Sequence, residues 1–371
     1  MPPIVPVPGR SAPSAAPAAA RPAASVAAPD RRFALTVIVP AYNEAASVGD
    51  TIRSLQAQTL PPDEIIVVDD GSTDGTGDVA RALGVTVARP ARNTGSKAGA
   101  QSFALPRVTT PFVMAIDADT TLAPDAIERL HPAFDDDAVV AACGYVLPRR
   151  VSTLWERGRY VEYLFAFTFY KQVQDYFGKP TIASGCFSMY RTDALRDVGG
   201  WSSRTLAEDM DLTWTFFQRG HGVRFVSAAV SYPIEPHDLA FMRSQLRRWS
   251  HGFVQNVRLH GRGILGVPFL RFSVAVAIWD ATIATFAYFV GIPLLTLALG
   301  QPWPLLGYLL DVPALLVPMV AGAAPRQEVG RALASLPGFL VLRILNTIHF
   351  VEAVWSEVVR GRSLHVYEKG H

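Results

Sequence analysis

The sequence predicts an α/β fold with a doubly wound parallel sheet, followed by helices that enter a membrane. Three observations lead to this prediction. Short apolar, β-branched runs alternate with helical patterns early in the chain, the order that builds a parallel sheet covered by helices. Acidic residues follow several of these runs directly. Three long apolar segments come later, and 50% of the 371 residues are hydrophobic.

Composition excludes some classes of protein. The formal net charge is +2, so charge gives no argument for a nucleic-acid partner, and we expect none. Residues 1–31 are mostly Pro, Ala, Ser and Val, which predicts a disordered tail. Prolines interrupt this tail, unlike the apolar core of a signal peptide, so we expect the N-terminal half to stay in the cytoplasm. The two cysteines, Cys143 and Cys186, match neither a zinc spacing nor a disulfide framework.

Strands and helices alternate from residue 33 onward. Phe33–Pro40 is a continuous apolar run, typical of a buried parallel strand, and Ser47–Gln58 places Val48, Ile52 and Leu55 on one helical face. The same patterns predict strands at Glu64–Val68, Val85–Ala88, Phe112–Ile116 and Ala138–Val146, and helices at Thr76–Leu83 and Pro124–Phe134. In such sheets ligands bind outside the carboxyl ends of the strands.

The following stretch is richer in aromatic residues. Trp155–Phe177 predicts a long helix that packs on the core or lies at the membrane surface. Ile182–Tyr190 predicts a strand with Ser184-Gly185 in its middle, where a glycine often marks the close approach of a ligand. Two more helices are predicted, at Leu206–Arg219 and at Arg243–His260, the second with Gln245, Arg248 and Trp249 within about one turn.

The C-terminal part predicts membrane helices. Phe272–Leu299 and Leu305–Ala324 are long and apolar enough to cross a bilayer. Leu333–Val359 carries a polar stripe that includes Arg343 and Asn346, which favours a helix in the membrane interface. Two crossings plus an interfacial helix place all the basic clusters that flank these segments on the cytoplasmic side. We therefore expect a tail at 1–31, a catalytic domain at 32–262, and a membrane region at 263–371 with two transmembrane helices and an interfacial or third membrane helix.

Polar motifs at the predicted strand ends indicate one site. Asp69-Asp70 and Asp117-Ala118-Asp119 each follow a strand, and Glu208-Asp209 opens a helix. Carboxylate oxygens suit a hard divalent cation that neutralises a diphosphate leaving group. Each motif alone also fits an ordinary solvated turn or helix cap. Their order, their spacing and their placement at strand ends together favour a catalytic site.

The chain resembles the family 2 glycosyltransferases of the GT-A fold across roughly residues 33–260. The matching motifs are Val39-Pro40-Ala41-Tyr42-Asn43-Glu44, Val68-Asp69-Asp70-Gly71-Ser72-Thr73-Asp74, Asn93-Thr94-Gly95-Ser96-Lys97-Ala98, Asp117-Ala118-Asp119, Glu208-Asp209 and Gln245-Leu246-Arg247-Arg248-Trp249. The last is similar to the Gln-x-x-Arg-Trp motif of the processive synthases of cellulose, chitin, hyaluronan and poly-N-acetylglucosamine. The resemblance implies a GT-A-like doubly wound mixed sheet.

It also implies a role for each matching residue. Asp209 would be the general base, with Glu208 beside it, and Asp119 would hold Mg²⁺ or Mn²⁺. The donor nucleotide would be bound by Pro40, Tyr42, Glu44, Asp69, Asp70, Lys97, Asp117 and Arg248, and the acceptor by Gln245, Trp249 and Gly185. These roles suit an inverting displacement, which needs a base on one face of the sugar and stabilisation of the leaving group on the other.

Three functions stay open at this point. The first is a membrane-bound inverting glycosyltransferase that adds N-acetylglucosamine or glucose from a UDP-sugar to a β-linked polysaccharide. The second is a single transfer to a polyprenyl phosphate or another lipid acceptor. The third is an inactive scaffold subunit of a synthase complex. The small membrane part makes us expect a homo-oligomer or a translocation partner if a polymer is exported. We expect a multi-pass protein of the inner or plasma membrane with its catalytic domain in the cytoplasm.

Overall fold

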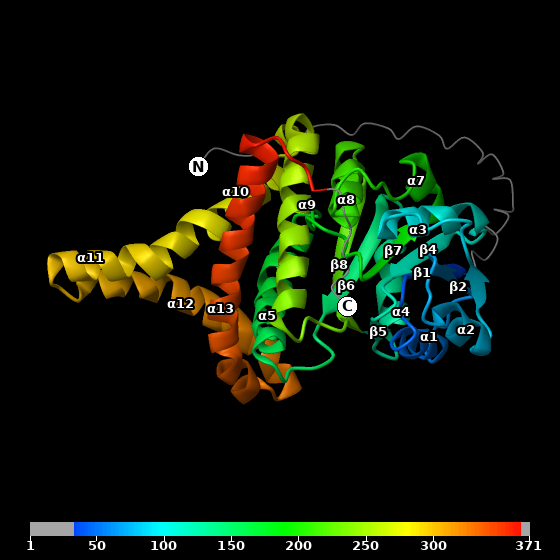
Figure 1. Cartoon of the computed structure of the whole chain (residues 1–371), viewed down its shortest axis with the longest axis horizontal. Helices are drawn as coiled ribbons and strands as arrows, with labels where there is room; N and C mark the ends of the chain where they lie inside the picture. The colour runs from blue at the N-terminus through cyan, green and yellow to red at the C-terminus, as the bar shows by residue number, and fades with distance from the viewer. Residues whose placement is uncertain (1–32, 365–371) are drawn as a thin grey trace, which may run out of the picture. The chain divides into compact units, whose positions relative to one another are not determined.

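The computed structural model describes residues 33–364, and the predicted tail at 1–31 and the last basic residue, Lys369, lie outside them. An eight-stranded sheet forms the catalytic part, in the order β3-β2-β1-β4-β7-β6-β8-β5 (Figure 1). The strands are β1 Leu35–Ala41, β2 Glu64–Asp69, β3 Thr86–Ala88, β4 Phe112–Ile116, β5 Thr121–Leu122, β6 Val139–Val146, β7 Phe187–Arg191 and β8 Gly222–Tyr232.

The sheet is mixed. Strands β3, β2, β1 and β4 run parallel, with Val39 opposite Val67 and Val37 opposite Met114. Strand β7 is antiparallel to both β4 and β6. Strand β8 runs parallel to β6, and the short β5 runs antiparallel to β8. The mixed sheet that the resemblance implies is therefore confirmed, and the wholly parallel sheet expected from the strand patterns is wrong.

Helices cover the sheet on both faces, and Figure 1 shows α3 and α7 on one side and α1, α2 and α4 on the other. The helices around the sheet are α1 Val48–Gln56, α2 Thr76–Ala82, α3 Lys97–Ala104, α4 Ala126–Leu130, α7 Thr192–Asp197 and α8 Glu208–Gln218. All seven residues of β1 are buried, as a strand covered on both faces requires. This arrangement brings the carboxyl ends of β1, β2 and β4 to one edge.

A long helical segment connects the sheet to the membrane part. It consists of α5 Leu154–Phe165, a π-helical turn at Ala166–Tyr170, and α6 Lys171–Tyr176. A capping box starts α5: the Thr153 side chain accepts from the Glu156 N–H, and Glu156 accepts from the Thr153 N–H. Residues of α5 such as Tyr160 and Leu164 share one apolar core with Val140 of β6 and Met319 of the membrane part. The sheet and the candidate membrane helices thus have a common core.

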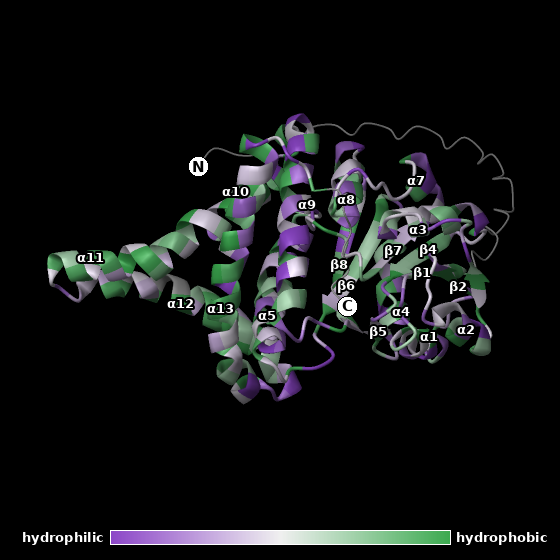
Figure 2. Cartoon of the chain, viewed as in Figure 1, coloured by the Kyte–Doolittle hydropathy of each residue, from purple (hydrophilic) through white to green (hydrophobic). Residues whose placement is uncertain are grey.

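Three helical segments are long and apolar enough to cross a membrane: Pro268–Leu299, Trp303–Arg326 and Val329–Val359. They contain α10 Pro268–Trp279, α11 Ile292–Leu299, α12 Tyr308–Ala323 and α13 Val329–Val354. The apolar α11 and α12 form a hairpin that projects from the other helices (Figure 2). The third segment meets the same criterion as the first two, so its interfacial position stays a prediction.

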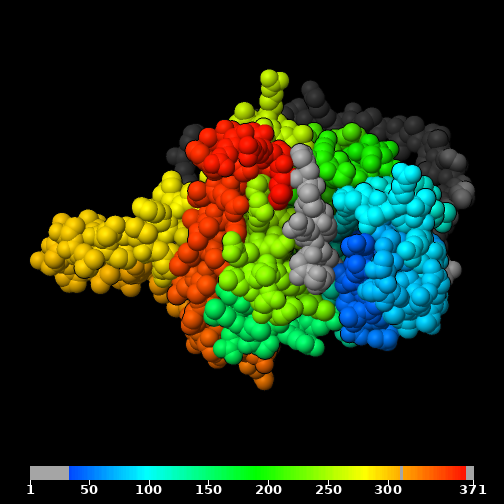
Figure 3. Space-filling view, viewed as in Figure 1, coloured from blue at the N-terminus to red at the C-terminus, as the bar shows by residue number. Residues whose placement is uncertain are grey.

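Helix α13 differs from the other two segments because other helices cover it. It packs against α5 and against α9 Leu239–Leu265, and Figure 3 shows α9 and α13 side by side. In the most apolar 18-residue stretch of Val329–Val359, 39% of the residues are buried, compared with 6% in that of Pro268–Leu299. Asp238 caps the start of α9, where its side chain accepts from the Phe241 N–H at 2.8 Å, and the helix runs past the predicted boundary at 262–263. That boundary stays a prediction.

One predicted element is wrong in a way that matters for the site. Strand β7 begins only at Phe187, so Ser184-Gly185 precede the strand and do not lie in its middle. The Phe187 N–H donates to the Ser184 carbonyl at 3.1 Å, which closes a turn over Gly185 and Cys186. The turn leaves the backbone N–H and C=O of Gly185 free of the sheet ladder and available to side chains.

Candidate active site

A cavity of about 670 Å³ lies between the carboxyl end of β4, the turn before β7, the start of α8, and helices α5, α9, α10, α12 and α13. This volume is in the range of small-molecule sites. The predicted site residues that line it are Lys97, Asp117, Asp119, Gly185, Glu208, Asp209, Gln245, Arg248 and Trp249. Residues from four separate motifs, together with Gly185, therefore meet at one cavity.

Lys97 and Asp209 hold the Gly185 turn from two sides. The Lys97 ammonium forms an ion pair with Asp117 and lies 3.6 Å from a Glu208 oxygen. It also donates to the Gly185 carbonyl at 2.9 Å. The Gly185 N–H in turn donates to Asp209 Oδ2 at 2.8 Å. The predicted base and the predicted donor lysine are thus connected through one glycine backbone.

Gly185→Ala is expected to lower activity about 10- to 100-fold, because small displacements of reacting groups have effects of this size. The added methyl group would lie 2.9 Å from Lys97 Nζ and 3.1 Å from Asp209 Oδ2, so both side chains must move. The fold should tolerate it, since Gly185 has no positive φ. Steady-state rates and Tm check this. Gly261→Ala, where an added methyl group meets nothing within 4 Å, is the control; equal rates for the two variants would contradict the prediction.

Glu208 and Asp209 occupy the first turn of α8, where the helix dipole favours negative charge. Glu208 is buried, and burial raises the pKa of its carboxyl; the charge of Asp209 also raises it, while Lys97 lowers it. Asp209 accepts hydrogen bonds from two backbone groups, the N–H of Gly185 and the N–H of Met210 at 2.8 Å. These fixed donors orient the Asp209 carboxylate in the cavity wall.

A further carboxylate, Glu235, lines the same cavity and was not predicted. It follows β8 and is only 4% exposed, and its carboxylate accepts from the Tyr163 hydroxyl at 2.8 Å. Burial raises the pKa of Glu235 to about 7, against the opposing effect of Arg159. The adjacent Ile234 N–H donates to the Asp119 carbonyl at 3.3 Å, which places this loop beside the Asp117–Asp119 turn.

This raised pKa predicts a pH-dependent stability. A carboxyl group with a folded-state pKa of about 7, above its ordinary 4.5, stabilises the fold fully below pH 4.5 and loses that contribution as pH rises through about 7. Glu235→Gln cannot ionise, so its Tm should rise relative to the wild type between pH 5 and pH 8, by about 2–4 °C per kcal/mol recovered. Thermal unfolding in detergent at several pH values tests this, with Glu64→Gln as control. A difference in Tm that does not change with pH would contradict the prediction.

Gln245 and Trp249 meet a buried arginine of α5. Arg159 Nη2 donates to Gln245 Oε1 at 2.6 Å, and the Arg159 guanidinium lies 4.3 Å from the centre of the Trp249 ring. Trp249 is 38% exposed and lines the cavity. The Arg159 guanidinium therefore covers one face of the Trp249 indole, which the resemblance predicts to bind the acceptor.

Five predicted donor residues do not line this cavity: Pro40, Tyr42, Glu44, Asp69 and Asp70. They follow or end β1 and β2, next to β4 in the sheet order. Asp69 pairs with Arg89 at 2.7 Å and accepts from the Ser72 N–H at 2.9 Å, so its contacts support the loop. Asp70 accepts from the N–H and the hydroxyl of Thr94, each at 2.8 Å. Their binding of the nucleotide stays a prediction.

Comparison with known proteins shows which enzymes the chain resembles. Residues 36–199 match the model of glycosyl transferase family 2. A poly-β-1,6-N-acetyl-D-glucosamine synthase of Staphylococcus aureus is 26% identical over 227 residues, and one of Staphylococcus epidermidis is 25% identical over 228 residues. The chain is thus similar to family 2 glycosyltransferases. The family match ends before Glu208 and Gln245, so their assignment rests on the motifs and the geometry.

The matches differ in extent. The aligned part is 60% of this chain and 55% of the S. aureus synthase, so the chain spans little more than half of these curated relatives. Among solved structures, a mannosyltransferase from Pyrobaculum calidifontis, in complex with GDP-Man and Mn²⁺, aligns with a TM-score of 0.57. That alignment covers 88% of this chain and 89% of the other chain at 20% identity. It supports a GT-A-like fold.

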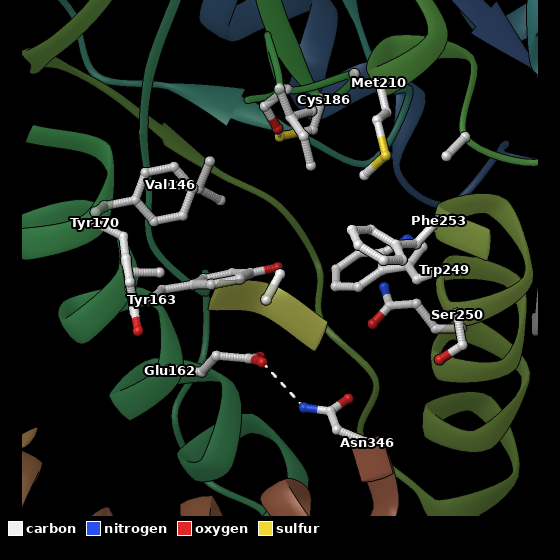
Figure 4. A pocket seen from close by; sticks show the side chains of 18 of the residues that line it. Val146, Glu162, Tyr163, Tyr170, Cys186, Met210, Trp249, Ser250, Phe253 and Asn346 are labelled. Carbon is white, nitrogen blue, oxygen red and sulfur yellow. Dashed lines mark hydrogen bonds between the residues drawn. The ribbon is translucent and has the colours of Figure 1, made fainter. Parts of the chain in front are cut away.

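The cavity extends beyond the predicted site residues to the candidate membrane helices (Figure 4). Arg343 of α13 pairs with Asp280, which follows α10, at 3.0 Å. Asn346 of α13 donates to Glu162 of α5 at 3.2 Å. The apolar residues at this end are Ala277, Ala281, Ala314, Leu315, Phe339 and Phe350. The cavity thus has a charged end at the sheet and a mixed, largely apolar end between the candidate membrane helices.

Proposed function

We propose that the chain is an inverting glycosyltransferase of the cell membrane that adds N-acetylglucosamine or glucose from a UDP-sugar to a growing β-linked polysaccharide. The observation that carries the proposal is the single cavity that joins Asp117 and Asp119 to Asp209 and then to Gln245 and Trp249. A donor and an acceptor must meet within one such cavity for direct transfer. The similarity to poly-β-1,6-N-acetyl-D-glucosamine synthases supports the sugar and the polymer.

The groups on either side of the reacting sugar have distinct roles in this proposal. Asp209 takes the proton of the acceptor hydroxyl, and Glu208 next to it adds negative charge at the base end. Lys97 and Arg248 stabilise the diphosphate as it leaves, since both are cations that line the cavity. Gly185 fixes the distance between the two sides, because its backbone contacts both Lys97 and Asp209.

The acidic turn after β4 fits a divalent cation. Asp117 and Asp119 both line the cavity, and carboxylate oxygens are the ligands that Mg²⁺ and Mn²⁺ prefer. Within residues 33–364, no group of three or more His, Cys, Asp and Glu side chains is arranged to hold a metal alone. Asp119 would therefore hold the ion together with phosphate oxygens of the donor, as is usual for Mg²⁺. The bound ion would supply charge neutralisation at the leaving diphosphate.

A second candidate function is a single transfer to a lipid acceptor such as a polyprenyl phosphate. The apolar residues of α10, α12 and α13 at the far end of the cavity favour it, because hydrocarbon binds to such a wall. The polar side chains there, including Arg343 and Asn346, instead suit the hydroxyl groups of a glycan. We place either acceptor at the cytoplasmic side of a multi-pass inner or plasma membrane protein, with an oligomer or a translocation partner if a polymer leaves the cell.

Nucleotide release tests the proposed reaction. The purified full-length protein would be incubated with Mg²⁺ or Mn²⁺ and with UDP-N-acetylglucosamine, UDP-glucose or GDP-mannose, the last because the Pyrobaculum calidifontis neighbour is bound to GDP-Man. We expect metal-dependent release from one UDP-sugar and none from GDP-mannose. Release from GDP-mannose alone would contradict the assigned donor, and no release from any donor would contradict the proposed function.

A further inference from the structure

Arg159 does not itself line the cavity but contacts residues that do, and 0% of its side chain is exposed. Burying a guanidinium without partners is strongly unfavourable, so its partners define what the residue does. Nη1 pairs with Glu162, Nε lies 3.5 Å from Glu235 Oε2, and Nη2 donates to Gln245 Oε1 at 2.6 Å. These partners come from α5, from the loop after β8 and from α9.

The same guanidinium also stacks on Trp249. Its central carbon lies 4.3 Å from the centre of the ring, a distance typical of a cation–π contact. Gln245 and Trp249 are four residues apart on α9 and so lie on one face of the helix. The Arg159 guanidinium therefore holds both residues, although Arg159 lies 86 residues before Gln245 in the sequence.

The network continues along the cavity wall. Glu162 accepts from Asn346 of α13, and Tyr163 donates to Glu235 at 2.8 Å. Figure 4 shows Tyr163 and Trp249 projecting into the cavity from facing helices, with the Glu162–Asn346 hydrogen bond beneath them. Of these residues, Glu235 also lies beside the Asp117–Asp119 turn, through the neighbouring Ile234. Lys97 and Asp117 at the donor end pair with each other.

We infer that Arg159 is a positioning residue for the acceptor: it holds Gln245 and Trp249 so that the acceptor hydroxyl faces Asp209. The inference rests on the proposed function. An arginine suits this role because its planar fork can donate to Gln245 and to a carboxylate while its face covers an indole, which the single ammonium of a lysine cannot do. Loss of this fork should therefore impair the use of the acceptor and leave the donor end intact.

Hydrolysis of the donor tests the donor end of the cavity alone, because water then replaces the acceptor. The full-length protein in lipid nanodiscs would be assayed with the donor identified above, with and without a short β-linked N-acetylglucosamine oligosaccharide. For Arg159→Lys we expect kcat/KM for the oligosaccharide to fall about 100-fold, mainly through KM, with hydrolysis and UDP binding within about twofold of wild type. An equal loss of transfer and hydrolysis, or unchanged transfer, would overturn the inference.

Two further variants keep the test decisive if Arg159→Lys is poorly folded. Gln245→Met removes the same hydrogen bond with Arg159 intact, and the double variant should lose no more than the worse single variant, because the two residues act as a unit. Losses that multiply in the double variant would overturn the inference. Arg224→Lys, which alters an ion pair with Asp175 outside this cavity, is the matched control. A wild-type protein that releases no nucleotide refutes the proposed function itself, and the acceptor role with it.

Discussion

Asp209→Asn is expected to retain donor binding and to lose sugar transfer about 10²- to 10⁴-fold, the usual contribution of a general base. The amide is nearly the same size as the carboxylate and can still accept from the Gly185 N–H, so the turn should stay in place. It cannot take a proton from an acceptor hydroxyl. Transfer rates and UDP binding, measured on the same preparation, separate the two effects.

A matched control for this variant exists in the first turn of another helix. Asp193 lies in the first turn of α7, as Asp209 lies in the first turn of α8, but its side chain is 99% exposed and outside the cavity. Asp193→Asn should leave the transfer rate unchanged. Transfer by Asp209→Asn at the wild-type rate would show that Asp209 is not the base.

Asp119→Ala is expected to abolish the metal dependence of donor binding and to reduce transfer by about 10²-fold or more, since a bound cation contributes several kcal/mol at a leaving phosphate. Asp119 is 6% exposed and lines the cavity at the end of the turn after β4. Titration of Mg²⁺ and Mn²⁺ against UDP affinity measures the effect directly.

The neighbouring carboxylate Asp125 provides the control for this metal titration. It follows the same turn but pairs with Arg129 at 2.6 Å at the surface, outside the cavity. Asp125→Ala should bind metal and UDP as the wild type does. An unchanged titration for Asp119→Ala would remove this residue from the metal site.

Continuous apolar runs made part of the fold predictable. Strands β1, β2 and β4 lie within one or two residues of their predicted bounds, because a strand buried on both faces has an apolar residue at nearly every position. The acidic residues that follow such strands are also readable, since the carboxyl ends of parallel strands meet at one edge. The sequence alone therefore indicates Asp117 and Asp119 as site residues.

The elements that the sequence did not predict lack such patterns. Helix α3 buries three alanines, Ala98, Ala100 and Ala104, and the polar Gln101, and these residues give a weak helical signal. Strand β8 pairs with β6 through two register shifts and shows no regular alternation of buried residues. The sequence pattern does not predict β8. It therefore gives no position for the loop after β8, and Glu235 of that loop cannot be assigned to the cavity from the sequence.

Arg159 could not be predicted for a different reason. Its partners Gln245 and Trp249 lie far along the chain, and a single arginine on a helix reads as an ordinary surface charge. Only the packing of α5 against α13, and the contacts of Arg159 with Gln245 and Trp249 of α9, place this residue behind the wall. Contacts between distant segments depend on tertiary structure and leave no periodic trace in one sequence.

The most direct test of the central claim is the fate of the transferred sugar. Membranes that contain the full-length protein would be incubated with Mg²⁺ or Mn²⁺ and with radiolabelled UDP-sugars, and the products separated into high-molecular-weight polymer and organic-extractable lipid. The proposed function predicts label in the polymer from one preferred donor, and loss of that label in Asp209→Asn. Label that appears only in the lipid fraction would contradict polysaccharide synthesis and establish a single transfer to a lipid carrier.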